Sequence, residues 1–279
     1  MSTTDHIDTS APPRDLRLAG IAGWAATVMV FTGVIISSST GAPEPNFDAS
    51  ADKIQRYLET QDAWAVAVGG FLLAFGLVAW LWFVCGLAAA VRRPGARPDL
   101  LSTVVLVSGT AAVAVMLNGA PQASEYRGGE GLDRQVAQFA FDLTSVTLAN
   151  MWVALGSLGL ATGWAILAGR REPASPERPA WPAWIAWPAW IGWWALAVGA
   201  GYLVVRMAFP SPLWYLPHIL FWVWILVVST RMLRVRRLPP QPLYEPLAGR
   251  LAVPSCHPTL TTTTSSGEPP ARPQQGPHR

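Results

Sequence analysis

Residues 63–91 read AWAVAVGGFLLAFGLVAWLWFVCGLAAAV, a run without a single Lys, Arg, Asp or Glu. A helix needs about 20 consecutive apolar residues to cross a hydrocarbon core of roughly 30 Å, and this run is longer. Lipid offers no hydrogen bonds to a bare backbone, so a single apolar run of this length can only be stable there as a helix. The run therefore predicts a membrane-spanning helix.

Five further stretches repeat this pattern. With the first they give six expected spans, at residues 18–37, 63–91, 100–119, 143–169, 189–207 and 214–230. The composition agrees, because 51% of the 279 residues are apolar and only 13% are charged, about half the charged fraction of a soluble domain. The predicted fold class is all-α, a polytopic membrane protein with six transmembrane helices.

The basic residues predict the orientation of these spans. If the spans alternate, one side of the membrane receives Arg14, Arg17, Arg92, Arg93, Arg97, Arg170, Arg171, Arg178, Arg231, Arg234, Arg236 and Arg237. The other side receives most of the acids, namely Glu44, Asp48, Asp52, Glu59, Asp62, Glu125, Glu130, Asp133 and Asp142. Loops rich in Lys and Arg stay in the cytoplasm. We therefore expect cytoplasmic N and C termini and a location in the cytoplasmic (inner) membrane.

Three parts of the chain follow from this topology. Residues 1–17 form a cytoplasmic N-terminal tail, and residues 18–237 form the six-helix transmembrane domain. Residues 238–279 are rich in Pro and Thr, a composition that cannot bury a core and that predicts a disordered cytoplasmic tail.

Both outer loops contain an amphipathic helical pattern. After the breakers Pro43 and Pro45, apolar residues recur at helical spacing from Ile54 onward, with Ser50 placed as an N-cap. The second outer loop has a helix start at Asp133 that can continue into the fourth span. Helices of this kind lie on the membrane surface as lids or anchors, and a ligand-binding role is the alternative.

Polar side chains at membrane depth are the candidate site residues, because they are costly there. Asp142 stands at the mouth of the fourth span, Arg206 ends the fifth on the same side, and His218 lies one turn into the sixth. These three residues form a predicted polar cluster at the outer mouth. The alternative is that they are interfacial residues that pair or reach the surface for structural reasons.

The fourth span carries a second candidate feature. Thr147, Asn150 and Ser157 follow one another at helical spacing and share one face. Small and hydroxylic residues permit close helix contact and interhelical hydrogen bonds, so helix packing is the first interpretation. A polar path, with Asn118 of the third span opposite, is the second.

The sequence predicts no cofactor or metal. His218 is the only histidine within a span, which excludes a haem held by two histidines of one chain. Cys85 and Cys256 lie in an apolar run and in the tail, without the spacing of a metal site or a disulfide framework. The sequence contains no phosphate-binding Gly-Lys loop and no paired carboxylates within the spans, so neither of these motifs indicates an enzyme.

The bilayer is the expected partner. The cluster formed by Arg231, Arg234, Arg236 and Arg237 is placed to meet anionic lipid headgroups. The Arg residues occur as short clusters between apolar runs, which fits membrane topology and argues against nucleic-acid binding.

Residues 15–237 resemble a large group of uncharacterised six-span integral membrane proteins of high-GC actinobacteria. The resemblance rests on the segment Pro43–Gln61 before the second span, the Arg-Arg ends of spans two and four, and the Trp-Pro start of span five. It implies a six-span topology, and because the function of that group is itself unassigned, it supplies no activity. For function, the sequence favours a non-catalytic accessory, signalling or envelope-associated protein, with a small-molecule transporter or permease component and then a membrane-embedded enzyme as alternatives.

Overall fold

The computed structural model describes residues 13–39, 41–92, 99–117, 133–171, 187–210, 213 and 215–234, and these contain helices but no strand. The described residues form seven helices: α1 (Pro13–Ser38), α2 (Ala51–Glu59), α3 (Ala63–Val91), α4 (Leu100–Met116), α6 (Arg134–Arg171), α7 (Ala189–Met207) and α8 (Tyr215–Leu233). Five of them, α1, α3, α6, α7 and α8, are long and apolar enough to cross a membrane, and α4 is a shorter apolar helix. The all-helical, multi-pass prediction is confirmed.

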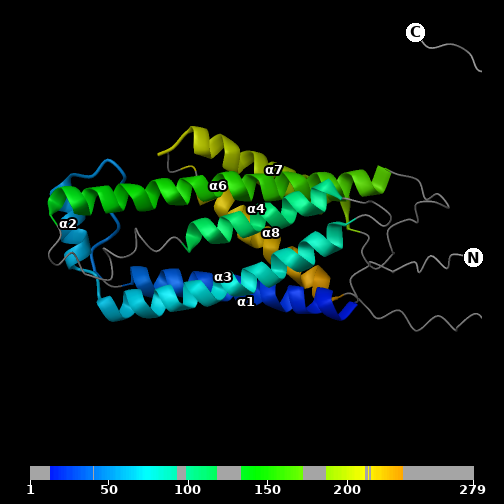
Figure 1. Cartoon of the computed structure of the whole chain (residues 1–279), viewed down its shortest axis with the longest axis horizontal. Coiled ribbons are helices and arrows are strands. Elements are labelled where there is room, and N and C mark those ends of the chain that lie inside the picture. Colours follow the sequence, from blue (N-terminus) through cyan, green and yellow to red (C-terminus); the bar gives the residue numbers. More distant parts are fainter. Residues whose placement is uncertain are drawn as a thin grey trace, which may run out of the picture. The chain divides into compact units, whose positions relative to one another are not determined.

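These five helices and α4 form a bundle whose main contacts close a ring. Around it, α1 packs on α3, α3 on α4, α4 on α6, α6 on α7, α7 on α8, and α8 again on α1. Successive helices run in opposite directions (Figure 1). The interior holds the largest fully buried side chains, Trp152, Trp224, Tyr202, Phe83 and Phe221 among them.

The outer surface of the bundle is also apolar. Phe71, Trp82, Val107, Trp193 and Val223 are 41–63% exposed, and similar side chains cover the other helices. A protein surrounded by water rarely exposes so continuous an apolar surface, whereas a bilayer stabilises it. Lipid therefore surrounds this bundle.

Helix α6 is longer than a membrane span requires. Its 38 residues correspond to about 57 Å at 1.5 Å per residue, compared with roughly 30 Å of hydrocarbon. In Figure 1 the N-terminal end of α6 extends past its neighbours, and α2 lies beside it. We call this end of the bundle the α2 end. The long helix bears out the suggestion that the helix starting near Asp133 continues into the fourth span.

The apolar face of α2 is covered by protein. Ile54 and Leu58 of α2 are buried against Ala137 and Phe141 of α6. A salt bridge of 2.8 Å between the exposed side chains of Arg134 and Asp52 joins the same two helices. Ser50 is the N-cap residue as expected, although its side chain makes no capping hydrogen bond. Helix α2 is thus docked on α6 and does not present its apolar face to the membrane surface.

Glycines let several helices approach at backbone distance. In the contact between α6 and α7, a Cβ added to Gly163 would lie 2.6 Å from the carbonyl oxygen of Gly192, and one added to Gly156 would lie 3.1 Å from that of Gly199. These pairs fix an antiparallel register in which residue 163 faces 192 and residue 156 faces 199. The same register sets which polar side chains of α6 and α7 can meet.

Candidate functional site

The structure pairs Arg206 with Asn150. The Arg206 Nη2 donates to Asn150 Oδ1 at 3.1 Å, and among the described residues no ion pair joins Arg206 to Asp142. The glycine register explains this pairing, because it places Arg206 opposite the turn that contains Asn150. Asp142 lies two turns before Asn150 on α6, about 12 Å from it along the helix axis. The predicted cluster is therefore not assembled around Asp142.

His218 has its own partners within the bundle. Its Nδ1 lies 3.0 Å from the hydroxyl of Tyr202, and its Nε2 accepts a hydrogen bond of 3.0 Å from the indole N–H of Trp222. An indole nitrogen can only donate, so Nε2 carries no proton and the neutral ring holds its proton on Nδ1. That proton is donated to the Tyr202 oxygen. The imidazole thus links α7 to α8.

The polar stripe of α6 serves helix contacts. Ser157 shares a hydrogen bond of 2.9 Å with Ser108 of α4, Asn150 binds Arg206, and Thr147 is half-buried on the same helix. Asn118, expected opposite the stripe, lies outside the described residues. The two partners thus come from different helices, with Ser157 facing α4 and Asn150 facing α7.

A cavity of about 460 Å³ opens at the α2 end. Three segments that are distant in sequence form it: the loop 44–48, the part of α6 from Phe141 to Trp152, and the α7–α8 turn at Phe209–Pro210 with Tyr215. We call this cavity the outer pocket, after the outer loops that the sequence predicts at this end. Its size falls within the range of small-molecule sites, about 300–1,000 Å³. The outer pocket is the candidate functional site.

Aromatic rings form much of the lining of the outer pocket. The Phe209 ring centroid lies 5.0 Å from that of Phe47, edge to face, and 6.0 Å from that of Trp152. Phe141 and Tyr215 add two further rings. Ring faces carry partial negative charge and attract cations.

The charged groups of the lining are both acids. Glu44 and Asp48 line the outer pocket, and no Lys, Arg or His does so among the described residues. Glu44 is exposed by its surface fraction, yet the surrounding protein desolvates its carboxyl group and raises its pKa above the usual value. Carboxylates beside aromatic rings make an environment suited to a positively charged organic group.

Sequence reasoning missed this pocket. Phe47, Trp152 and Phe209 stand far apart in the chain and share no motif. The only available signal was the position of Glu44 and Asp48 beside an aromatic residue in a loop that the sequence predicts on the outer side. Within the described ranges, no group of three or more His, Cys, Asp or Glu side chains is placed to hold a metal ion.

The fold and this pocket define a class, a multi-pass helical membrane protein with a cavity at one end of its bundle. No family model, curated protein or solved structure matches the chain.

Proposed function

We propose that the chain is a non-catalytic accessory or signalling protein of the cytoplasmic membrane that binds a small organic cation on its outer side. The observation that carries the proposal is the outer pocket, in which aromatic rings surround a cavity whose charged lining residues are Glu44 and Asp48. Its volume of about 460 Å³ accommodates a ligand with an apolar body and an amine or quaternary ammonium group.

The proposal includes six crossings, with α4 as the third. Helix α4 has only 17 residues, yet its exposed face consists of Leu100, Thr103, Leu106, Val107, Thr110, Ala111 and Ala114, all uncharged. Side chains of this kind along a whole helix face suit contact with acyl chains. A helix of this length, about 26 Å, spans the core with a small local adjustment of the bilayer.

The charges of the described residues support an outer location for the α2 end. The opposite end, which we call the Arg end, carries Arg14, Arg17, Arg92, Arg170, Arg231 and Arg234. The α2 end carries four described bases, Lys53, Arg56, Arg134 and Arg206, which are outnumbered by seven described acids, Glu44, Asp48, Asp52, Glu59, Asp62, Asp133 and Asp142. By the positive-inside rule the Arg end faces the cytoplasm, and its arginines meet the anionic inner leaflet there. Arg236 and Arg237 belong to the same proposal and lie outside the described residues.

Reporter fusions test this orientation. Fusions after Arg97 and Arg178 are expected to give a cytoplasmic signal, and fusions near Asp52 and Arg127 an external one, because each Arg cluster holds its loop inside. An alkaline phosphatase and a fluorescent protein reporter at each position supply opposite readouts. An external signal from either Arg-rich loop would contradict the orientation.

Ligand binding is tested with benzyltrimethylammonium as the probe. We expect the purified protein in detergent to gain thermal stability with this cation, since ligand bound to the folded state stabilises it by mass action. Toluenesulfonate, of similar size and opposite charge, is expected to give no shift. Phe209→Ala removes the ring that contacts both Phe47 and Trp152, and should weaken binding about fivefold, the equivalent of roughly 1 kcal/mol.

A matched pair of charge changes completes this test. Asp48→Asn removes a carboxylate from the pocket lining, whereas Glu59→Gln removes one from α2, where Glu59 accepts a hydrogen bond from Gln55. Only Asp48→Asn should weaken the cation's binding. Equal effects of the two changes, or an equal shift with the sulfonate, would refute the organic-cation site.

The transporter alternative receives less support. A polar path would need the α6 stripe to face an open channel, whereas Ser157 is hydrogen-bonded to Ser108 and Asn150 to Arg206. These contacts suit a packed helix interface. A protein that holds its ligand at the membrane surface and passes on a conformational signal fits the outer pocket better.

A further inference from the structure

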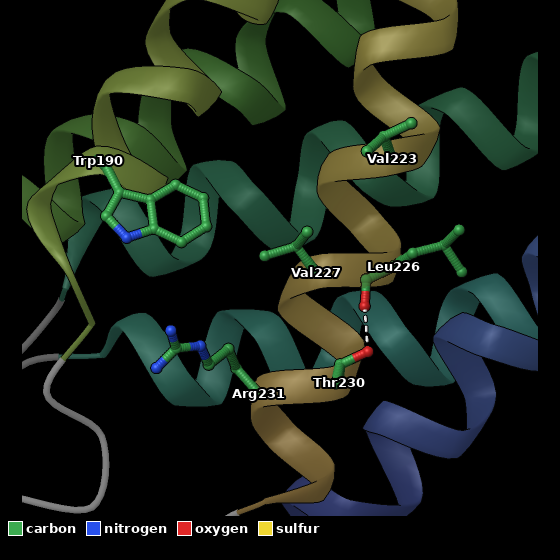
Figure 2. A pocket seen from close by; sticks show the side chains of 6 residues that line it. All are labelled: Trp190, Val223, Leu226, Val227, Thr230 and Arg231. Carbon is green, nitrogen blue, oxygen red and sulfur yellow. Dashed lines mark hydrogen bonds between the residues drawn. The ribbon is translucent and has the colours of Figure 1, made fainter.

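A second cavity lies on the outer surface of the bundle, between α7 and α8 near the Arg end. Its volume is about 240 Å³, and its lining consists of Trp190, Val223, Leu226, Val227, Thr230 and Arg231. We call it the α7–α8 groove. Figure 2 shows the Trp190 ring from α7 and the Arg231 side chain from α8 on the same side of α8, with Val227 directed between them.

We propose that the α7–α8 groove binds one anionic phospholipid of the surrounding membrane. Its acyl chain lies along Val223 and Val227 against the Trp190 ring, and its phosphate group is held by the Arg231 guanidinium. The proposal rests on the membrane embedding given above, and it does not depend on the outer pocket or its ligand.

The order of residues along α8 matches the order of groups in a phospholipid. Val223, Val227 and Arg231 follow at four-residue steps on one face of the helix, so about 12 Å of apolar groove ends at a cation. Arg231 stands in the last turn of α8 and Trp190 in the first turn of α7. Both are therefore at headgroup level, where a phosphate group and the first acyl carbons meet.

Hydrogen bonding singles out Arg231 as the group that recognises the phosphate. The Thr230 hydroxyl already donates to the Leu226 carbonyl at 2.7 Å and accepts from the Trp24 indole at 3.2 Å. No acidic side chain lines the groove. Within the part of the chain that the structure describes, the exposed Arg231 guanidinium makes no hydrogen bond or ion pair. A guanidinium can donate two parallel hydrogen bonds to phosphate oxygens.

Native mass spectrometry tests the site on the full chain in detergent micelles with added phosphatidylglycerol. We expect one lipid to remain bound to the wild-type protein. Arg231→Gln should lower the one-lipid fraction about tenfold, because a charge-assisted pair is lost. Val227→Trp should also lower the one-lipid fraction, because the indole fills the groove. Val223→Trp should do the same from one turn earlier in α8.

Arg234→Gln is the matched control. Arg234 belongs to the same basic cluster and directly follows the last residue of α8, yet it does not line the groove. It should change the bound fraction by less than about twofold. Equal losses for Arg231→Gln and Arg234→Gln would show general attraction to the cluster and overturn the site, as would full binding in both Trp variants.

Two competition arms identify the source of the phosphate. Inorganic phosphate at the concentration of the lipid should displace none of it, because the acyl chain supplies part of the binding, and displacement would overturn the lipid assignment. Phosphatidylcholine should bind less than phosphatidylglycerol, since its ammonium group neutralises the phosphate. Circular dichroism of each variant shows whether its helical bundle is intact. A loss of lipid binding by a variant with an intact bundle is then due to the change in the groove.

Discussion

Gly163→Leu is expected to prevent the assembly of α6 on α7 and to leave little folded protein after detergent extraction. A Cβ at residue 163 would lie 2.6 Å from the Gly192 carbonyl oxygen and 2.9 Å from the Leu196 backbone nitrogen. Neither is the flexible end of a side chain, so the helices themselves must separate. Overpacking of this kind costs about 1–3 kcal/mol for a few added methyl groups, and a leucine adds four carbons.

The measurement is the thermal midpoint of the extracted protein, with its monodisperse fraction by size-exclusion chromatography. Gly163→Ala and Gly201→Ala form a matched pair of the same chemical change. Alanine gains about 0.5–1 kcal/mol over glycine inside a helix, and at Gly201 the nearest atom to the new Cβ is Pro217 Cβ at 3.3 Å. We expect Gly201→Ala to be neutral or stabilising and Gly163→Ala to lower the midpoint. A tolerated Gly163→Leu would disprove the close approach of α6 and α7.

Much of the helical fold could be predicted from the sequence, because in lipid a long uncharged run has few alternatives to a helix. The run 63–91 coincides with α3, and 189–207 coincides with α7. The spacing of Ile54 and Leu58 correctly indicated a helix with one apolar face. It could not indicate what covers that face, because the covering residues, Ala137 and Phe141, lie on another helix some eighty residues later.

The polar contacts depended on a register that no single span encodes. Asp142 and Arg206 were expected to meet because both stand at the mouth of an expected span. Helix α6 begins at Arg134, and its glycine contacts with α7 place Arg206 opposite Asn150. The outer pocket is harder still to predict, since the loop at Phe47 and the turn at Phe209 meet only in three dimensions.

His218→Leu is expected to lower the stability of the bundle by about 2 kcal/mol. The substitution removes the hydrogen bonds to Tyr202 and Trp222, both 3.0 Å long. Hydrogen bonds inside membrane proteins contribute about 0.6 kcal/mol on average and at most about 1.7 kcal/mol, and the two buried groups left without a partner add to the loss. Tyr202 is fully buried, so its hydroxyl loses this partner without gaining water. The unfolding of the extracted protein, followed by circular dichroism in a denaturing detergent, measures the change.

A double-mutant cycle separates this network from simple packing. If the imidazole acts as the partner of the phenol, Tyr202→Phe should be destabilising in the wild-type protein and close to neutral in the His218→Leu background, because the stranded hydroxyl is then already without its partner. Trp222→Phe should behave in the same way through the other ring nitrogen. Strictly additive effects in both cycles would show that His218 contributes only its volume. A coupling of the expected sign would establish that the hydrogen bonds of His218 hold α7 and α8 together, where each helix presents a polar group to the apolar interior.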